Sequence, residues 1–122
     1  MNLSGSLYEI TQSEITDQSA LYSIQLNEND IIYQGHFPGF PVTPGVIQIK
    51  LVEELLGKAM GLSLRLDSIN QSKFLNVIDP NKDPLVEVNI NYEKDGEKIS
   101  TQASFLQNGT IVFKLQAVFS IY

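Results

Sequence analysis

The residues with the most potential for chemistry lie in one short segment, Tyr33 to Gly45, which contains the only histidine of the chain, His36. Three prolines and three glycines surround this histidine, which indicates a constrained loop. The loop leads into a helix pattern that begins at Thr43 or Pro44. Free N–H groups at a helix N-terminus stabilise an anion, and a histidine beside them is a candidate general base. The segment therefore predicts acid–base chemistry at the start of a helix.

The helix that follows is the longest apolar pattern in the chain. It is expected to run from Val46 to Leu56 and to end between Gly57 and Gly61. Thr43 is expected to cap it, with Pro44 at the first helical position, where a missing N–H costs nothing. The helix is apolar over most of its surface, which predicts that it is largely buried. A separate stripe is expected to meet something other than the main core, and it consists of Lys50, Glu54, Gly57 and Gly61.

Segments with strand character flank the helix on both sides. Two are expected before it, from Leu7 to Thr11 and from Leu21 to Leu26. A dipeptide typical of hairpin turns, Asn108-Gly109, joins the last two of the later strands. This order predicts an α+β fold with an antiparallel sheet around one helix, in one domain covering residues 1–122. The later strands are expected at Ser72–Ile78, Leu85–Tyr92, Ile99–Leu106 and Ile111–Ile121.

Composition narrows the classes of function. Hydrophobic residues make up 43% of the 122 residues, which is enough for one core. The absence of cysteine excludes disulfides and a thiolate nucleophile, and with one histidine it leaves no expectation of a metal or other cofactor. A net charge of −6 argues against a nucleic-acid partner. Because no apolar run approaches the length of a membrane span and no leader pattern is present, a cytoplasmic protein is expected.

From Gly35 to Val46 the chain resembles the active-site motif of the 3-hydroxyacyl-acyl-carrier-protein dehydratases of fatty-acid synthesis, G-H-F-P-G-x-P-x-x-P-G-V. Every fixed position of the motif is present, whereas the rest of the resemblance is loose. The resemblance implies a hot-dog fold, in which a long antiparallel sheet wraps a central helix and two subunits pair to build two sites. It also implies a homodimer or larger assembly that acts on an acyl thioester of acyl carrier protein or coenzyme A.

The same resemblance implies roles for individual residues. His36 would take the proton next to the thioester carbonyl, and the Gly45 amide would donate a hydrogen bond to that carbonyl. The acyl chain would lie in an apolar tunnel at the dimer interface. The substrate-binding residues implied in this way are Gly45, Phe37, Gly39, Phe40 and Val46.

One departure from the family pattern concerns the proton donor. The family places a catalytic carboxylate fourteen residues after the histidine, and this chain has Lys50 there. Glu54 lies one helical turn further along the same stripe. Glu54 is favoured as the substitute acid, Lys50 is the second candidate, and loss of dehydration is the third interpretation. The purely structural alternative is an ion pair between Lys50 and Glu54.

Three functions remain open, and they are distinguished by these two side chains. The first is a hydro-lyase that eliminates water from a 3-hydroxyacyl thioester in fatty-acid or polyene-type synthesis. The second is a non-catalytic protein that binds an acyl group or partners an active subunit, which Lys50 favours. The third is a hot-dog thioesterase, which would need Glu54 to direct a water molecule. Docking of an acidic carrier protein would depend on local basic residues, and the candidates are Arg65, Lys73 and Lys82.

Overall fold

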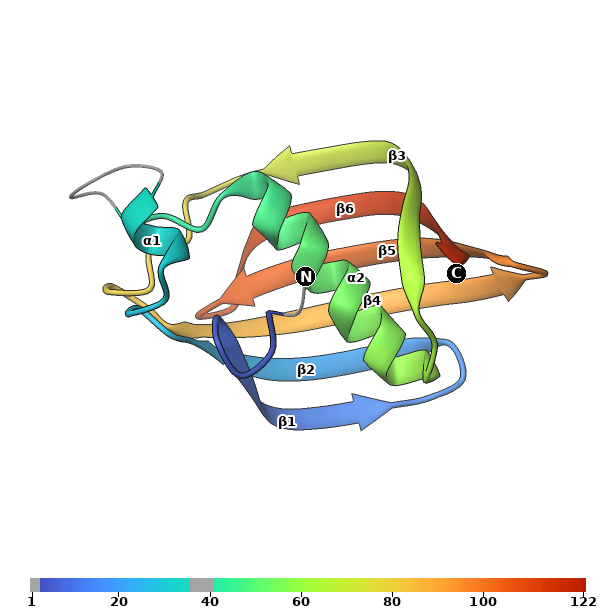
Figure 1. Ribbon diagram of the computed structural model, residues 1–122, viewed down its shortest axis with the longest axis horizontal. Helices are drawn as coiled ribbons and strands as arrows, with labels where there is room; N and C mark the ends of the chain where they lie inside the picture. The colour runs from blue at the N-terminus through green and yellow to red at the C-terminus, as the bar shows by residue number, and fades with distance from the viewer. Residues whose placement is uncertain (1–2, 36–40) are drawn as a thin grey trace.

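The computed structural model describes residues 3–35 and 41–122. Six strands form one antiparallel sheet in the order β1-β2-β4-β5-β6-β3, and the long helix α2 lies across one face of it (Figure 1). The α+β hot-dog arrangement expected from the sequence is therefore confirmed. The elements are β1 (Tyr8–Ile15), β2 (Ser19–Leu26), α1 (Ile32–Gly35), α2 (Gly45–Met60), β3 (Leu64–Phe74), β4 (Leu85–Asp95), β5 (Lys98–Gln107) and β6 (Thr110–Ile121).

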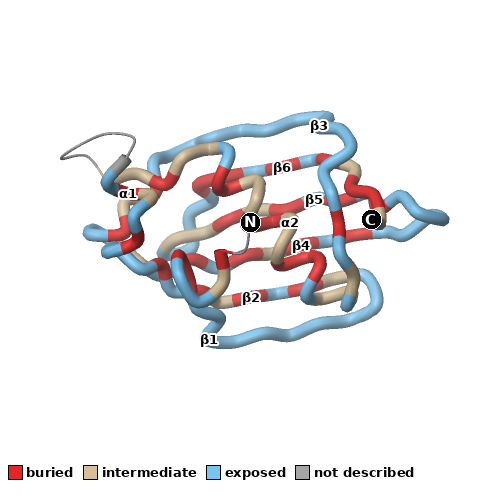
Figure 2. Tube along the Cα trace, viewed as in Figure 1, coloured by how far each residue is buried: buried red, intermediate tan, exposed pale blue. Residues whose placement is uncertain are grey.

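The core lies between α2 and the concave face of the sheet. On the strands, buried and exposed residues alternate along β2, β4 and β5, so that one face of each strand meets the helix (Figure 2). The edge strands β1 and β3 are exposed along nearly their whole length. On the helix, the side that faces the sheet is fully buried and consists of Leu51, Val52, Leu55 and Leu56.

Two boundaries of strands and helices lie where the local sequence predicts them, namely the turn between β5 and β6 and the end of α2. Asn108 and Gly109 have φ values of 52° and 75°, the positive values that a two-residue hairpin turn requires, and they join β5 to β6. At the end of α2, Gly61 adopts a left-handed φ of 67° and its N–H caps the Gly57 carbonyl. The helix thus ends in the expected interval.

The predicted start of the helix is wrong by one or two residues. Pro44 is the N-cap, with extended backbone angles (φ −60°, ψ 147°) and no side-chain capping bond, and the helix begins at Gly45. Thr43 does not cap because its hydroxyl pairs with the Tyr33 hydroxyl at 3.0 Å. Tyr33 itself lies in α1, a short helix that the sequence analysis did not predict.

The third predicted strand is also wrong over most of its length. A strand was expected over Ser72–Ile78, whereas β3 runs from Leu64 to Phe74 and the chain then leaves the sheet. Along β3 only Leu64 is buried, because the strand lies at the edge of the sheet. An edge strand without a buried face has no alternation of apolar and polar residues, so its sequence gives no signal of period two.

Within residues 3–35 and 41–122, no helix has the length and apolar character needed to cross a membrane.

Candidate active site

The N-terminus of α2 opens onto a groove of about 620 Å³ between the helix and the chain that follows β3. The amides of Ile47 and Gln48 donate to the Pro44 carbonyl, whereas no described residue accepts a hydrogen bond from the amides of Gly45 and Val46. These two N–H groups thus have no acceptor among the described residues, and they lie at the positive end of a 16-residue helix, where an anion is stabilised. The groove is lined mainly by apolar side chains, those of Val42, Pro44, Phe74, Leu75 and Val77.

An aromatic ring lies against Gly45, so a larger residue at this position would require the ring or the helix start to shift. A Cβ built on Gly45 would come within 2.8 Å of Phe74 Cζ and 2.9 Å of Cε1. The Phe74 ring is in turn stacked on the Phe113 ring, with centroids 4.9 Å apart. This packing brings β3 and the helix N-terminus together and sets one wall of the groove.

Thr43, which precedes the helix, is held by three hydrogen bonds. Its hydroxyl pairs with the Tyr33 hydroxyl at 3.0 Å, and its amide donates to the Ile78 carbonyl at 2.8 Å. Its carbonyl accepts a hydrogen bond from Gln48 Nε2 at 3.0 Å. These bonds fix the backbone directly before Gly45 and so fix the position of the Gly45 and Val46 amides.

Burial raises the pKa of the Tyr33 phenol to about 12, and Asp30 and Asp79 reinforce the shift, while the hydrogen bond to Thr43 opposes it. The folded protein therefore holds this proton at a pH where the unfolded chain, with a tyrosine pKa near 10, has lost it. The free energy of unfolding should fall as the pH rises from about 10 to about 12. Tyr33→Phe should weaken that dependence, and urea unfolding at several alkaline pH values would measure it. An unchanged dependence in the variant would contradict the assignment.

Lys50 and Glu54 lie on a different groove, which they share with Gly57, Lys58 and Tyr122. The ion pair considered between Lys50 and Glu54 is not formed. Lys50 Nζ instead pairs with Glu53 Oε2, while Glu53 Oε1 accepts a hydrogen bond from the Leu66 amide at 2.9 Å. Glu53 thus ties the helix to the beginning of β3.

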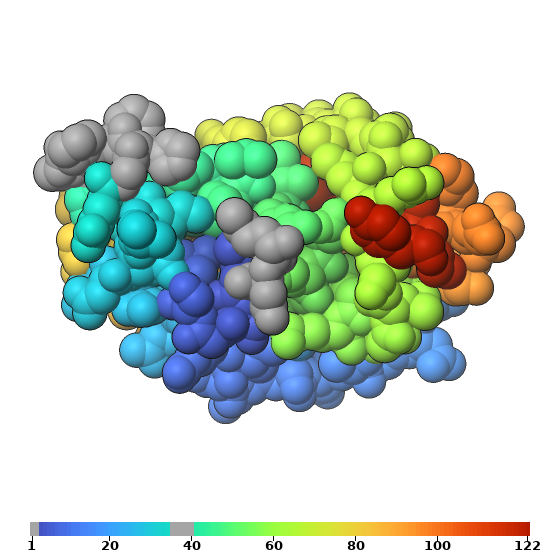
Figure 3. Space-filling view, in the orientation of Figure 1, coloured from blue at the N-terminus to red at the C-terminus, as the bar shows by residue number. Residues whose placement is uncertain are grey.

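Glu54 binds the N-terminal segment of the chain. Its Oε2 accepts a hydrogen bond from the Leu3 amide at 2.6 Å, and its Oε1 accepts one from the Tyr8 hydroxyl at 3.2 Å. Burial raises the pKa of the Tyr8 phenol, and the charge and hydrogen bond of Glu54 raise it further, so Tyr8 stays a donor. In Figure 3 the N-terminal segment, in blue, lies against the green surface of α2.

Replacing Glu54 with alanine should therefore destabilise the fold. The change leaves the fully buried Tyr8 and the Leu3 amide without their shared acceptor, and the loss should be about 1–3 kcal/mol in the free energy of unfolding. Urea denaturation would measure it. Glu87→Ala is the matched control, because Glu87 is exposed on β4, and it should change stability by less than about 0.5 kcal/mol. Equal effects of the two changes would show that the hydrogen bonds of Glu54 to Leu3 and Tyr8 do not stabilise the fold.

Gly57 has a role that the sequence analysis did not foresee. The stripe that contains Gly57 was expected to meet something other than the main core, and a Cβ on Gly57 would lie 2.8 Å from the Leu62 carbonyl oxygen. The Leu62 amide also donates to the Gly57 carbonyl at 3.0 Å. The space at Gly57 is thus used by the chain's own turn after α2.

The structure brings together only part of the predicted site. Gly45 lies on the groove at the helix N-terminus, Val46 is 69% exposed on the first turn, and Lys50 and Glu54 line the second groove. A single protomer therefore does not place the candidate acids beside Gly45. Four further predicted residues lie outside the described residues, namely His36, Phe37, Gly39 and Phe40.

Gln48 is a residue of the groove that the sequence analysis missed. It is 3% exposed and lies on the buried side of α2, where its neighbours one and two turns away are Leu51, Val52 and Leu55. A polar residue on an otherwise apolar helix face was the available signal, since buried polar groups need partners.

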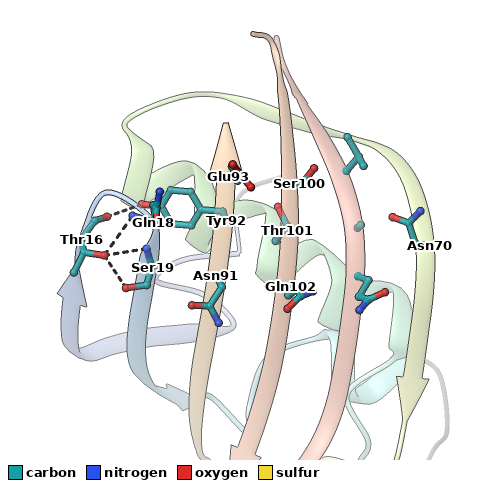
Figure 4. Close-up of a pocket in the computed structure, with 13 residues that line it drawn as sticks. Thr16, Gln18, Ser19, Asn70, Asn91, Tyr92, Glu93, Ser100, Thr101 and Gln102 are labelled. Atoms are coloured by element: carbon teal, nitrogen blue, oxygen red, sulfur yellow. Dashed lines mark hydrogen bonds between the residues drawn. The ribbon is translucent and has the colours of Figure 1, made fainter. Parts of the chain in front are cut away.

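Another hollow lies on the opposite face of the sheet, away from α2 (Figure 4). Its floor is made by exposed amide side chains on neighbouring strands, including Asn91 on β4, Gln102 on β5 and Gln116 on β6. None of the predicted site residues within the described ranges lies there. The hollow is thus separate from the groove at the helix N-terminus.

An antiparallel sheet of this topology around one central helix defines the hot-dog class, and solved structures of that class resemble the chain. One is the dehydratase heterocomplex ApeI:P from Xenorhabdus doucetiae, with a TM-score of 0.74 and 18% identity, covering 92% of this chain and 96% of that one. Another is a mutant of the thioesterase PA1618 from Pseudomonas aeruginosa, with a TM-score of 0.62 and 13% identity, covering 92% and 80%. At these identities the likeness shows the fold.

The family follows from the sequence comparison. The chain belongs to the ApeI-like dehydratase family, whose description is ApeI dehydratase and which matches residues 12–111. It is also similar to the 3-hydroxyacyl-(acyl-carrier-protein) dehydratase FabZ of Novosphingobium aromaticivorans, with 33% identity over 70 residues, 50% of this chain and 43% of that protein. FabZ of Caulobacter vibrioides is 29% identical over 97 residues, 63% of this chain and 61% of that protein. The matched parts thus span about half of these two curated relatives.

Proposed function

We propose that the chain is a hydro-lyase that eliminates water from a 3-hydroxyacyl thioester carried on an acyl carrier protein in the cytoplasm. The observation that carries the proposal is the groove at the start of α2, where two amides without described acceptors meet an apolar wall. Gly45 belongs to the motif that the sequence shares with the acyl-carrier-protein dehydratases. An apolar groove with a few placed donors is the kind of site that takes an acyl thioester.

The proposed chemistry is a β-elimination. His36 removes the proton on C2, next to the thioester carbonyl, and the Gly45 amide donates a hydrogen bond to the carbonyl oxygen as negative charge develops there. The electron pair of the broken C–H bond then forms the C2–C3 double bond. The hydroxyl on C3 leaves with a proton from a general acid, as water, because hydroxide alone is a poor leaving group.

Lys50 fits the role of this acid better than Glu54. Both oxygens of Glu54 already accept hydrogen bonds from the chain itself, one from the Leu3 amide and one from the Tyr8 hydroxyl. The ammonium group of Lys50 has three N–H donors and is 34% exposed, with Glu53 as its ion-pair partner. The contacts therefore favour Lys50, the second candidate of the sequence analysis.

A site that uses both Gly45 and Lys50 requires a second copy of the chain, because the two residues line different grooves of one protomer. Exposed apolar side chains around the first groove support a homodimer, since burying them removes a large apolar patch from water. The strand β3 also forms one edge of the sheet, and the backbone N–H and C=O groups on its outer side can pair with a second copy. The exposed apolar residues are Val46, Phe74, Leu75 and Val77, with exposures of 49–69%.

We therefore expect a dimer at micromolar concentration, and Val77→Asp should produce monomers with no dehydratase activity. A charge placed at this 61% exposed position would have to be buried on association. Light scattering coupled to gel filtration measures the mass. Leu21→Asp is the matched control, because Leu21 is exposed on β2 away from the groove. A wild-type monomer with full activity would rule out the shared site.

A non-catalytic role as a partner subunit is the second candidate, because Lys50 stands where the dehydratases have a carboxylate. One structural relative is named as a dehydratase heterocomplex. In that case the chain would bind an acyl group or support an active subunit.

The assay that tests the proposed function supplies purified protein with 3-hydroxyacyl-carrier protein, in parallel with the corresponding coenzyme A thioester. Loss of water is followed by intact-mass spectrometry of the carrier, which also detects hydrolysis to the free carrier. Water loss is the expected result, whereas release of free carrier would identify a thioesterase. No reaction of either kind, with retained binding of the acyl carrier, would favour the non-catalytic role. Arg65, Lys73 and Lys82 are exposed and are the proposed contacts for an acidic carrier.

A further inference from the structure

Gln48 contains a buried hydrogen-bond acceptor for which the described part of the chain offers no donor. Its Nε2 donates to the Thr43 carbonyl at 3.0 Å, whereas its Oε1 is buried and has no partner among the described residues. An unpaired buried acceptor is unfavourable, and such atoms are rare in folded proteins. A ligand donor or an ordered water is the usual explanation.

The position of Gln48 links this acceptor to the groove. Gln48 lines the groove together with Gly45, one turn earlier on the same helix. The hydrogen bond from Gln48 Nε2 to the Thr43 carbonyl holds the side-chain amide back towards the helix N-terminus, beside the residues that precede Gly45.

The surroundings of Gln48 make its acceptor selective. The other side chains of the groove are mostly apolar, with Val42, Phe74, Leu75 and Val77 among them. An unsubstituted acyl chain in this groove has no donor for the amide oxygen, whereas a hydroxyl on C3 has one. A site with a buried acceptor therefore penalises the ligand that lacks the donor.

We propose that Gln48 is a specificity-determining residue, whose side-chain carbonyl accepts a hydrogen bond from the 3-hydroxyl group of the bound acyl chain. This inference rests on the proposed function for the identity of the ligand, and it concerns binding alone. The hydrogen bond also orients the hydroxyl, so that a lone pair on its oxygen faces the incoming proton.

The test compares two unreactive ligands that differ only in the 3-hydroxyl group. Both are acyl-pantetheine analogues in which an amide replaces the thioester, so neither can be hydrolysed. Their dissociation constants are measured by isothermal titration calorimetry on the dimer or whatever assembly the wild-type chain forms. Wild type should bind the hydroxylated ligand about 5- to 10-fold more tightly, the effect of one hydrogen bond to a buried acceptor.

Two variants separate the acceptor from the support that Gln48 gives to Thr43. Gln48→Met keeps the volume but removes the acceptor, and it should bring the ratio of the two dissociation constants to about 1. Tyr33→Phe removes a different hydrogen bond to Thr43 and leaves the acceptor in place, so it should keep the wild-type ratio. If Gln48→Met does not fold, Gln48→Leu takes its place because it also lacks the acceptor, and a ratio that stays at the wild-type value in that variant would overturn the proposal.

Equal binding of the two ligands by wild type would overturn the proposal and would assign the acceptor to a buried water. Equal weakening of both ligands in Gln48→Met would also overturn it, leaving Gln48 as a support for Thr43. Because the ligands are unreactive, a protein without dehydratase activity can still show the preference. Failure of the proposed function is therefore distinguishable from failure of this inference.

Discussion

Replacing His36 with alanine should lower the rate of dehydration of a 3-hydroxyacyl-carrier protein by about 10²–10⁴-fold, because a positioned general base contributes about that much. Lys50→Met should cause a loss of the same order if Lys50 protonates the leaving hydroxyl. Glu54→Gln should affect stability more than rate, since Glu54 binds Leu3 and Tyr8. Initial rates at saturating substrate, measured together with urea denaturation of each variant, would show which substitutions lower the rate and which lower the stability.

Lys94→Met is the control for the loss of a positive charge, because Lys94 is exposed near the end of β4 and lines neither groove. It should leave the rate nearly unchanged. A folded Glu54→Gln protein with a loss as large as that of His36→Ala would restore Glu54 as the acid. Normal rates for both Lys50→Met and Glu54→Gln would mean that water supplies the proton.

Gly45→Ala should lower the dehydration rate by about 10²-fold, the effect of moving a catalytic donor by roughly 1 Å. The added methyl group would lie 2.8 Å from the Phe74 ring, so either the ring or the first turn of α2 must shift. Phe74→Leu should remove most of this conflict, and the double variant should regain much of the rate. The measurement is kcat for wild type, both single variants and the double variant.

Gly57→Ala provides the contrast, because its methyl group meets the Leu62 backbone carbonyl oxygen at 2.8 Å and not a side chain. That variant should lose stability, and Phe74→Leu should not rescue it. Full activity in Gly45→Ala would show that the amide of residue 45 does not bind the substrate carbonyl.

The sequence alone located the elements whose signals are local. The Asn108-Gly109 turn has the positive φ values that its residues favour, and the alternation over Leu85–Tyr92 lies within β4. The apolar run after Pro44 forms α2, and Gly61 ends it. Each of these signals is carried by residues that are neighbours in sequence, so no distant contact was needed to interpret it.

Edge position and side-chain partners could not be predicted in this way. The strand β3, whose bounds were predicted wrongly, has no buried face. Thr43 does not cap the helix because its hydroxyl bonds to Tyr33, ten residues earlier. The partner of Glu54 is the Leu3 amide, 51 residues away, although the spacing with Lys50 suggested a local ion pair. These contacts depend on how the folded elements meet, and helical spacing alone does not specify them.

The sequence by itself determined the class of this protein, because the motif from Gly35 to Val46 and the order of elements are both properties of the chain. The tertiary structure was needed to show that Gly45 and Lys50 line different grooves. It was also needed to show that the side-chain oxygen of Gln48 is buried with no donor among the described residues. The physical reason is that a residue's type sets the bonds it can make. The packing of α2 against the sheet and the N-terminal segment decides which of those bonds are made within the chain and which remain for a ligand or a second copy.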